Sequence, residues 1–261
     1  MSNKAVVLLN FGGPRNLEEV PDFLFEILRD PYVIQFPFPL KIQDFLARKI
    51  SRKRSAHVRE QYQQIGGKSP IVQATNEQKN ALETELRKEG LSIPVYAVHR
   101  YLQGHADEVA GQIVKDQRTE LYLIPMYPHY SFSTSGTSFL QITESLKKAG
   151  FQGKYQALRS YPNQAGYICA LSEQIQSTLT KNKLNLEHTL ILCSAHGLPK
   201  SYVDKGDPYF SELHMTMEEL RKRFPEWKWQ LSFQSRVGPA EWLKPYTNEL
   251  IPELPSQQIK N

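Results

Sequence analysis

The sequence predicts an α/β protein with parallel sheets, and three observations lead to this prediction. Strand and helix signals alternate along the chain, which is typical of βα-repeating folds. The alternation starts again after Gly150, so the chain reads as two βα-repeating halves. Its 261 residues suit one large domain or two small ones. We therefore expect one domain over residues 1–150 and a second over residues 151–261.

The first half opens with a short apolar run over residues 6–11, which predicts the first strand. Apolar residues at helical spacing predict a helix over 17–28, and Pro31, Pro37 and Pro39 then break the chain into a connector. The other expected elements are helices at 41–50, 57–65, 75–88, 106–116 and 138–149 and strands at 95–98 and 120–125.

In the second half, strands are expected at 155–158, 189–193 and 229–233, and helices at 165–179, 209–224 and 242–250. The strand over 189–193 reads as short and buried, and His196, Gly197 and Pro199 follow it closely. Glycine and proline forbid regular continuation, which places the imidazole at the carboxyl end of a strand, where open α/β sheets bind ligands. The alternative interpretation is a histidine with a purely structural role, whose ring nitrogens have hydrogen-bond partners within the protein.

The composition is that of an ordinary soluble protein. Apolar residues make up 40% of the chain, charged residues 23%, and the mean hydropathy is −0.50. No apolar stretch approaches the length of a transmembrane helix, and the N-terminal apolar run reads as a strand and not as a signal peptide. Cys169 and Cys193 form no CxxC motif, so we expect no disulfide framework, no iron–sulfur site and a cytoplasmic location.

A cluster of basic residues interrupts the mixed charge pattern. The net charge is +5, and six cations without an acid lie between Arg48 and Arg59. One interpretation is a solvated helix face and loop. The other is attraction of an anionic small molecule or of an anionic membrane surface, which would make the protein peripheral at a membrane. No nucleic acid is expected, because the cluster lacks interleaved aromatic residues and any nucleic-acid-binding motif.

Two loops that follow predicted strands carry residues suited to ligand binding. Gly12, Gly13 and Pro14 form either a structural turn or a close backbone approach to a ligand. The third glycine of a dinucleotide fingerprint is absent, so no nucleotide cofactor is expected. Residues 127–138 combine hydroxyls with aromatic rings, which suits a flat, apolar ligand with polar edges. We expect one of these hydroxyls to cap the following helix.

Several motifs occur in one order along the chain and together point to a family. They are Leu9–Pro14, Glu60–Tyr62, Ile65–Ile71, Arg100-Tyr101, Tyr127–Ser131, Ser194–Pro199, Gly206–Tyr209, Gln234–Pro239 and Trp242-Leu243. With these residues the chain resembles ferrochelatases, the enzymes that insert ferrous iron into a porphyrin, over essentially all of its length. The resemblance implies two Rossmann-like, chelatase-type domains with parallel sheets and a porphyrin cleft between them.

The resemblance also implies roles for individual residues. His196 would face the macrocycle in the cleft, where it binds the metal, accepts pyrrole protons, or does both. The candidates for packing on the porphyrin ring are Phe11, Tyr62, Tyr127 and Trp242, with ordinary core packing as the alternative, and those for contact with its carboxylates are Arg54, Ser69 and, more weakly, Lys53. Ferrous iron would be a substrate, and its partner a porphyrin dicarboxylate or tetracarboxylate (protoporphyrin IX or coproporphyrin III).

The C-terminal end departs from the family pattern. Family members continue into a further apolar strand and an acidic motif whose glutamate partners the histidine, whereas this chain ends at Gln258–Asn261. Glu249 and Glu253 do not match that motif. We therefore expect a truncated product with an incomplete second domain and a metal site without its partner glutamate. In addition, His99 stands where the family often has methionine.

Three functions stay open at this point. The first is a ferrochelatase of heme biosynthesis, which the segments at 127–131 and 234–239 favour. The second is a porphyrin-binding remnant with impaired catalysis, and the third is a related cobalt chelatase. The iron–sulfur cluster of animal family members is not expected, because the chain has two cysteines and no C-terminal extension.

Overall fold

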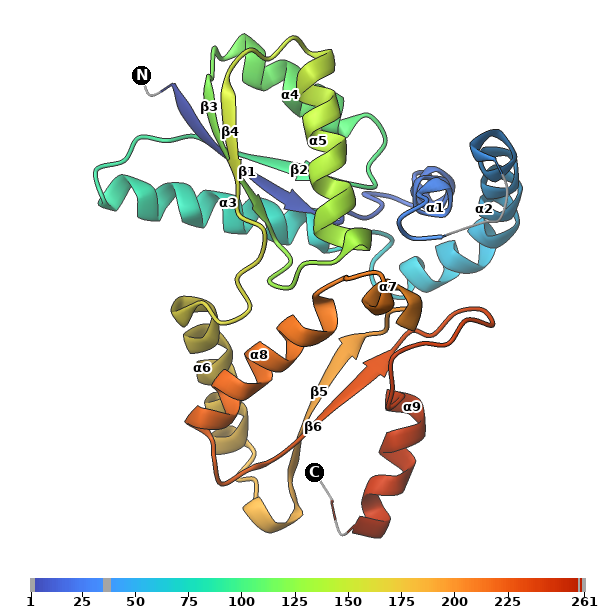
Figure 1. The fold of residues 1–261 in the computed structure, drawn as a ribbon, viewed down its shortest axis with the longest axis vertical. Helices are drawn as coiled ribbons and strands as arrows, with labels where there is room; N and C mark the ends of the chain where they lie inside the picture. Colours follow the sequence, from blue (N-terminus) through green and yellow to red (C-terminus); the bar gives the residue numbers. More distant parts are fainter. Residues whose placement is uncertain (1–2, 35–38, 258, 260–261) are drawn as a thin grey trace. The chain divides into compact units, whose positions relative to one another are not determined.

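The computed structural model describes residues 3–34, 39–257 and 259, and it has the predicted α/β architecture with parallel sheets (Figure 1). The chain forms two compact units. The first unit comprises residues 1–127 and 132–160, and the second unit comprises residues 128–131 and 161–261. The division into domains at residue 150 stays a prediction. Within the described ranges, none of the helices combines the length and the apolar character that spanning a bilayer requires.

The first unit is built on a four-stranded parallel sheet. Its strands are β1 (Lys4–Asn10), β2 (Val95–His99), β3 (Glu120–Pro125) and β4 (Lys154–Ala157), in the order β2-β1-β3-β4. β1 pairs with β2 on one edge and with β3 on the other, and five of its seven residues are buried. This central position explains why its sequence is a nearly continuous apolar run.

Three helices cover both faces of this sheet. They are α3 (Ile71–Lys88), α4 (His105–Lys115) and α5 (Thr137–Lys148). Side chains of β1 alternate between the faces, so that Val7 and Leu9 join one apolar core with residues of α4 and α5. Val6 and Leu8 pack on the other face with residues of α3. The loops at the carboxyl ends of these strands are thereby held on a scaffold that is covered on both sides.

The helices α1 (Val20–Arg29) and α2 (Leu40–Gln63) pack against one another in the first unit (Figure 1). The prediction of two separate helices over 41–50 and 57–65 is wrong, because α2 runs without a break. Ser51 and Ser55 lie between the two predicted pieces, and their hydroxyls donate to the carbonyls of Arg48 and Ser51 within the same helix. These serines therefore do not interrupt the helix.

The second unit contains two parallel strands, β5 (Leu190–His196) and β6 (Lys228–Gln234). Its helices are α6 (Ala165–Lys181), α7 (Lys200–Asp204), α8 (Tyr209–Arg223) and α9 (Thr247–Leu250), with 3-10 turns at Leu186–His188 and Ile251–Gln257. The prediction of a short buried strand over 189–193 is wrong in two respects. β5 extends to His196, and none of its seven residues is fully buried. In the described residues it pairs with β6 alone.

Other element boundaries also differ from the prediction. α3 begins at Ile71, directly after Pro70, and α7 is an additional short helix. The helix predicted over 242–250 is confined to α9, and a 3-10 turn continues through Pro252 and Pro255. Pro37 and the residues 258, 260 and 261 lie outside the described residues.

Candidate active site

His196 is the last residue of β5, and its side chain is exposed. Its Nδ1 lies 2.7 Å from the carbonyl oxygen of Gly197. Because a carbonyl oxygen only accepts hydrogen bonds, Nδ1 carries the proton in a neutral imidazole and Nε2 carries the lone pair. An exposed lone pair on Nε2 can accept a proton or bind a divalent metal ion.

Tyr209, the first residue of α8, positions the backbone of His196. Its hydroxyl donates to the carbonyl oxygen of His196 at 3.1 Å. Burial raises the pKa of Tyr209 to about 12, so the phenol stays protonated and remains a donor at neutral pH. The amide of Tyr209 in turn donates to Oδ1 of Asp207. The sequence offered Gly206–Tyr209 only as a family motif, and this role was missed.

Residues 128–131 belong to the second unit although both flanking segments belong to the first. His129 Nε2 lies 2.7 Å from the hydroxyl of Thr216, which itself donates to a backbone carbonyl, so His129 donates in this bond. The amide of Tyr130 donates to Glu212, and the Ser131 hydroxyl donates to Asp207. Ser131 and Tyr209 therefore share Asp207, which ties this segment to the element that positions His196.

Trp242 packs against Gly197, the residue that follows His196. A Cβ atom on Gly197 would lie 3.0 Å from Cε3 of Trp242, so the absence of a side chain at Gly197 permits this close approach. The amide of Leu243 donates to the carbonyl of Leu198 at 3.0 Å and holds the tryptophan in place. Trp242 therefore lies beside the residue that follows His196, and the roles of both side chains stay predictions.

In the first unit, Phe11 and Tyr62 belong to one aromatic row. The ring of Phe23 lies between them, with centroids 6.3 Å from Phe11 and 6.5 Å from Tyr62. Ser69 lies against the loop after β1, because a Cβ atom on Gly13 would come within 2.5 Å of its hydroxyl oxygen. The two glycine-marked loops around Gly13 and Ser69 therefore meet at the carboxyl end of β1.

For the other predicted residues of the first unit, the structure gives less support for a role in ligand binding. Arg54 is exposed on α2, and the described part of the chain shows no ion pair for it. Lys53 is exposed beside it. Tyr127 is half-buried after β3, and burial raises the pKa of its hydroxyl, so the ring stays neutral. The role of each of these side chains stays a prediction.

A buried carboxylate, Asp30, supports the aromatic row and was not predicted. Its Oδ2 accepts hydrogen bonds from Arg100 at 2.7 Å, Tyr101 at 2.9 Å and Thr137 at 2.7 Å. Tyr101 in turn lies 4.5 Å from Phe11, centroid to centroid. The π-helix Phe132–Gly136 leads directly into α5, and no side chain caps α5 at Gly136, where the predicted cap is therefore not found. Instead, Thr137 is part of this network.

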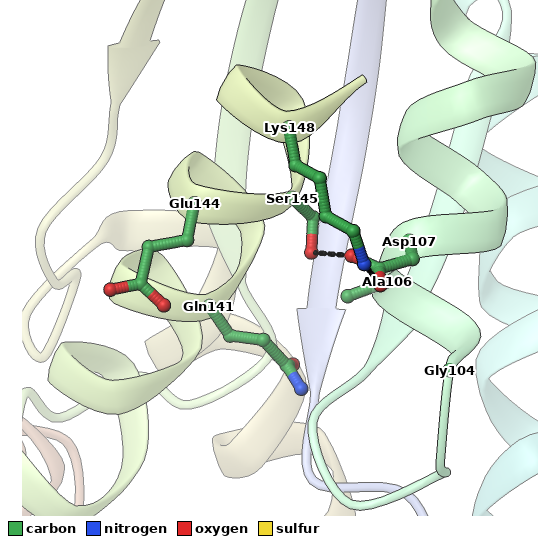
Figure 2. Close-up of a pocket in the computed structure, with 7 residues that line it drawn as sticks. All are labelled: Gly104, Ala106, Asp107, Gln141, Glu144, Ser145 and Lys148. Atoms are coloured by element: carbon green, nitrogen blue, oxygen red, sulfur yellow. Dashed lines mark hydrogen bonds and ion pairs between the residues drawn. The ribbon is translucent and has the colours of Figure 1, made fainter.

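A surface pocket of about 300 Å³ in the first unit contains none of these residues (Figure 2). It lies between α4 and α5, and two of its charged residues pair with one another. Lys148 forms an ion pair with Asp107, and the Ser145 hydroxyl donates to the same carboxylate. Gln141 is anchored by a hydrogen bond to the Arg100 carbonyl. This pocket is therefore not the candidate active site.

The candidate residues form two groups, one on each unit, and both groups lie at carboxyl ends of parallel strands. Phe11, Tyr62 and Ser69 surround the end of β1, and His196 and Trp242 lie at the end of β5. Among the described residues, no three His, Cys, Asp or Glu side chains are placed to hold a metal ion together. In the second group, the imidazole of His196 can bind one metal ion or accept one proton, and the indole of Trp242 offers a flat apolar surface.

Comparison with known proteins specifies the class of protein to which this chain belongs. The ferrochelatase family model matches residues 3–261, and the chain belongs to the ferrochelatase family. It is 38% identical to the ferrochelatase of Trichodesmium erythraeum over 268 residues, covering all of this chain and 68% of that protein. It is 39% identical to the ferrochelatase of Synechocystis sp., over 99% of this chain and 67% of that protein. For the chloroplastic ferrochelatase-2 of Hordeum vulgare the identity is 39%, over 98% of this chain and 54% of that protein.

Proposed function

We propose that this chain is a metal chelatase of heme biosynthesis that inserts ferrous iron into a porphyrin bearing carboxylate side chains. The family supports the reaction class. The observation that carries the proposal for the residues is the exposed side chain of His196, whose Nδ1 lies 2.7 Å from the Gly197 carbonyl, which leaves the lone pair of the neutral ring on Nε2. Protoporphyrin IX and coproporphyrin III are the two substrates that fit this reaction.

Insertion replaces two pyrrole N–H protons by one ferrous ion, so two protons must leave the porphyrin for each iron that enters. Nε2 of His196 accepts a pyrrole proton, and the resulting imidazolium keeps its Nδ1 bond to the Gly197 carbonyl. Because the side chain is exposed, this proton can pass on to solvent, after which Nε2 can accept the second pyrrole proton and release it in the same way. The Nδ1 bond to Gly197 orients the ring, and Tyr209 holds the backbone of His196 through its carbonyl, before the porphyrin binds.

The remaining candidate residues would bind the porphyrin. Phe11, Tyr62, Tyr127 and Trp242 offer apolar ring faces, and binding energy from such contacts can also distort the macrocycle and expose its nitrogen lone pairs. Arg54 and Ser69 would contact the carboxylates, Arg54 through its charge and Ser69 through its hydroxyl. Ferrous iron enters as a substrate in this proposal.

The decisive experiment is anaerobic iron insertion by the unmodified chain and by His196→Ala, with porphyrin affinity measured by fluorescence quenching. We expect the substitution to abolish insertion and to change porphyrin affinity by less than about tenfold, which corresponds to about 1.4 kcal/mol. Equal loss of insertion and affinity would show that His196 holds the ligand or the fold instead. Running cobalt beside iron tests for a cobalt chelatase, which a clear preference for cobalt would establish.

A second candidate function is porphyrin binding without catalysis. The observation that favours it is the absence of a three-residue metal-binding group among the described residues. Porphyrin binding with no insertion of either metal, in the unmodified chain, would establish this alternative and contradict the chelatase proposal.

A further inference from the structure

Asp207 lies two residues before the start of α8 and is only 3% exposed. Its Oδ1 accepts a hydrogen bond from the amide of Tyr209 at 3.0 Å, and its Oδ2 accepts one from the hydroxyl of Ser131 at 2.9 Å. The amide of Asp207 donates to the carbonyl of Tyr202 at 2.9 Å. Both carboxylate oxygens and the backbone of Asp207 are thus engaged, so the residue is fixed in one place beside the first turn of α8.

Tyr209 is held at its backbone by Asp207 and at its ring by His129. The imidazole of His129 meets the phenol edge-on, with ring centroids 6.1 Å apart and an interplanar angle of 87°. His129 is itself fixed, because its Nε2 donates to the hydroxyl of Thr216 at 2.7 Å. With backbone and ring both held, the phenol hydroxyl has a defined direction, in which it donates to the carbonyl of His196 at 3.1 Å.

The carbonyl of His196 and the amide of Gly197 belong to one planar peptide group. The amide of Gly197 donates to the carbonyl of Gln234 at 2.7 Å, so Tyr209 and Gln234 hold this group through its two polar atoms. The next carbonyl, that of Gly197, lies 2.7 Å from Nδ1 of the His196 ring. Because successive peptide planes share a Cα atom, fixing the first group limits the direction of the second carbonyl. The bond from Tyr209 therefore bears on the orientation of the imidazole.

Two sequence motifs meet at the start of α8, the one around Ser131 and the one around Asp207. They lie 76 residues apart in the sequence. The amide of Tyr130 donates to the buried side chain of Glu212 at 2.7 Å, which fixes the first motif on α8. This bond and the bond from Ser131 to Asp207 hold the short segment that carries His129. The two motifs thus form one support around Asp207.

We propose that Asp207 is a positioning residue for His196, which acts through Tyr209 and is held in place by Ser131. This inference rests on the proposed function, in which His196 accepts the pyrrole protons. The alternative is that Asp207 only starts α8. Starting a helix needs one acceptor for an amide of the first turn, which Oδ1 alone provides. The second oxygen instead binds the segment whose His129 packs on the same phenol.

The test is a double-mutant cycle on the rate of anaerobic iron insertion, with porphyrin affinity measured beside it. Asp207→Ala and Tyr209→Phe should each lower the rate by about tenfold and leave the affinity unchanged. Because Asp207 acts through the Tyr209 hydroxyl, the double variant should also lose about tenfold. Losses that multiply to about a hundredfold would show independent roles and overturn the proposal. A normal rate in Asp207→Ala would overturn it as well.

Two variants serve as a matched control and a rescue. Asp204→Ala removes the same carboxylate at the exposed end of α7, and it should leave the rate within about twofold. Asp207→Asn keeps an acceptor for the Tyr209 amide, and its amide nitrogen can donate to the Ser131 hydroxyl, since a hydroxyl both donates and accepts. It should therefore stay within about threefold of the unmodified chain. A rate as low as that of Asp207→Ala would contradict positioning by geometry.

Ser131→Ala is the second route to the same answer, for the case that Asp207→Ala does not fold in a urea titration. It keeps the carboxylate and removes one of the two bonds that hold it. The insertion rate should fall by about threefold, and this loss should disappear in the Tyr209→Phe background. A normal rate in Ser131→Ala, or a loss that persists in that background, would overturn the proposal.

The ring ¹⁵N signals of His196, recorded without porphyrin, separate positioning from a merely structural role. In the neutral ring, folded Asp207→Ala should populate the tautomer with its proton on Nδ1 less than the unmodified chain does. Asp204→Ala and Asp207→Asn should leave this population unchanged. An unchanged tautomer in folded Asp207→Ala would overturn the proposal. The measurement needs no insertion, so an unmodified chain that inserts no iron would contradict the proposed function and leave this test of Asp207 intact.

Discussion

β1 and β5 occupy equivalent places, since each is the first strand of its unit and each ends at a candidate site loop. Both are seven residues long. β1 has strands on both edges and helices on both faces, and five of its residues are buried. β5 pairs with β6 alone among the described strands, and none of its residues is fully buried. The comparison teaches that an apolar run specifies a strand, whereas its burial depends on the elements around it.

The difference has a consequence for the site. Local opening costs least where few apolar contacts and exposed backbone bonds hold an element in place. Phe11 and Ser69 therefore lie at the end of a stable strand, whereas His196 lies on a strand that opens more easily. Two hydrogen bonds from outside the sheet compensate for the missing neighbouring strand. The Tyr209 hydroxyl donates to the carbonyl of His196, and the amide of Leu243 donates to the carbonyl of Leu198.

The largest expected effect concerns the buried carboxylate of the first unit. Asp30→Ala leaves Arg100 without its partner, and Arg100 is only 14% exposed. Breaking a buried ion pair in this way lowers the free energy of unfolding by about 4 kcal/mol. Asp44→Ala is the control, because its pair with Arg29 is about half exposed and contributes less than about 1 kcal/mol. Urea unfolding measures both, and similar losses would contradict the role assigned to Asp30.

The second prediction compares the two strands directly. Leu9 in β1 is 1% exposed, whereas Leu192 in β5 is half-buried. Leu9→Ala should lower the free energy of unfolding by about 3 kcal/mol and Leu192→Ala by about 1 kcal/mol. Hydrogen exchange should show the same order, with the amides of β5 exchanging faster. Equal costs and equal protection would show that β5 is as well supported as β1.

The third prediction concerns acid stability. Burial lowers the pKa of His99 in the first unit and of His129 in the second unit to about 4. The unfolded chain, with a histidine pKa of about 6.5, binds more protons between these values. Stability should therefore be complete above about pH 6.5 and fall as the pH drops toward 4. His99→Met should flatten part of this profile in urea unfolding. An unchanged profile in that variant would show that His99 is not buried in its neutral form.

The smallest effect is expected at Tyr209. Tyr209→Phe removes the hydroxyl that bonds to the His196 carbonyl, which should lower stability by only about 1 kcal/mol. If Tyr209 positions His196, the insertion rate should fall by about tenfold, with porphyrin affinity unchanged and a shifted pH profile of insertion. Tyr155→Phe, at an exposed position of β4, is the control. A Tyr209→Phe variant with normal insertion at every pH would exclude the positioning role.

Local chemistry made some of these features predictable. His196 could be placed at a strand end because Gly197 and Pro199 stop regular structure just beyond it. The strands of the first unit could be placed because continuous apolar runs mark a sheet that is covered on both faces. The break expected between residues 50 and 57 is absent, and the hydroxyls of Ser51 and Ser55 bond to carbonyls within α2.

The contacts that build the site could not be predicted in the same way. Asp30 meets Arg100 and Thr137 across 70 and 107 residues of sequence, and no local pattern records such pairs. The bond from Tyr209 to the His196 backbone leaves no signal either, because any residue offers a carbonyl at that position. The burial of β5 was overestimated because an apolar sequence indicates a strand but does not indicate how many strands will lie beside it.

The central claim is that His196 offers an unprotonated Nε2, and its tautomer can be observed directly. Long-range ¹H–¹⁵N correlation spectra of the chain labelled at histidine nitrogens, with His196→Gln for assignment, distinguish the two ring nitrogens. In the neutral ring we predict a protonated Nδ1 and a lone pair on Nε2. A neutral ring that carries its proton on Nε2 would contradict the account of proton transfer from the porphyrin.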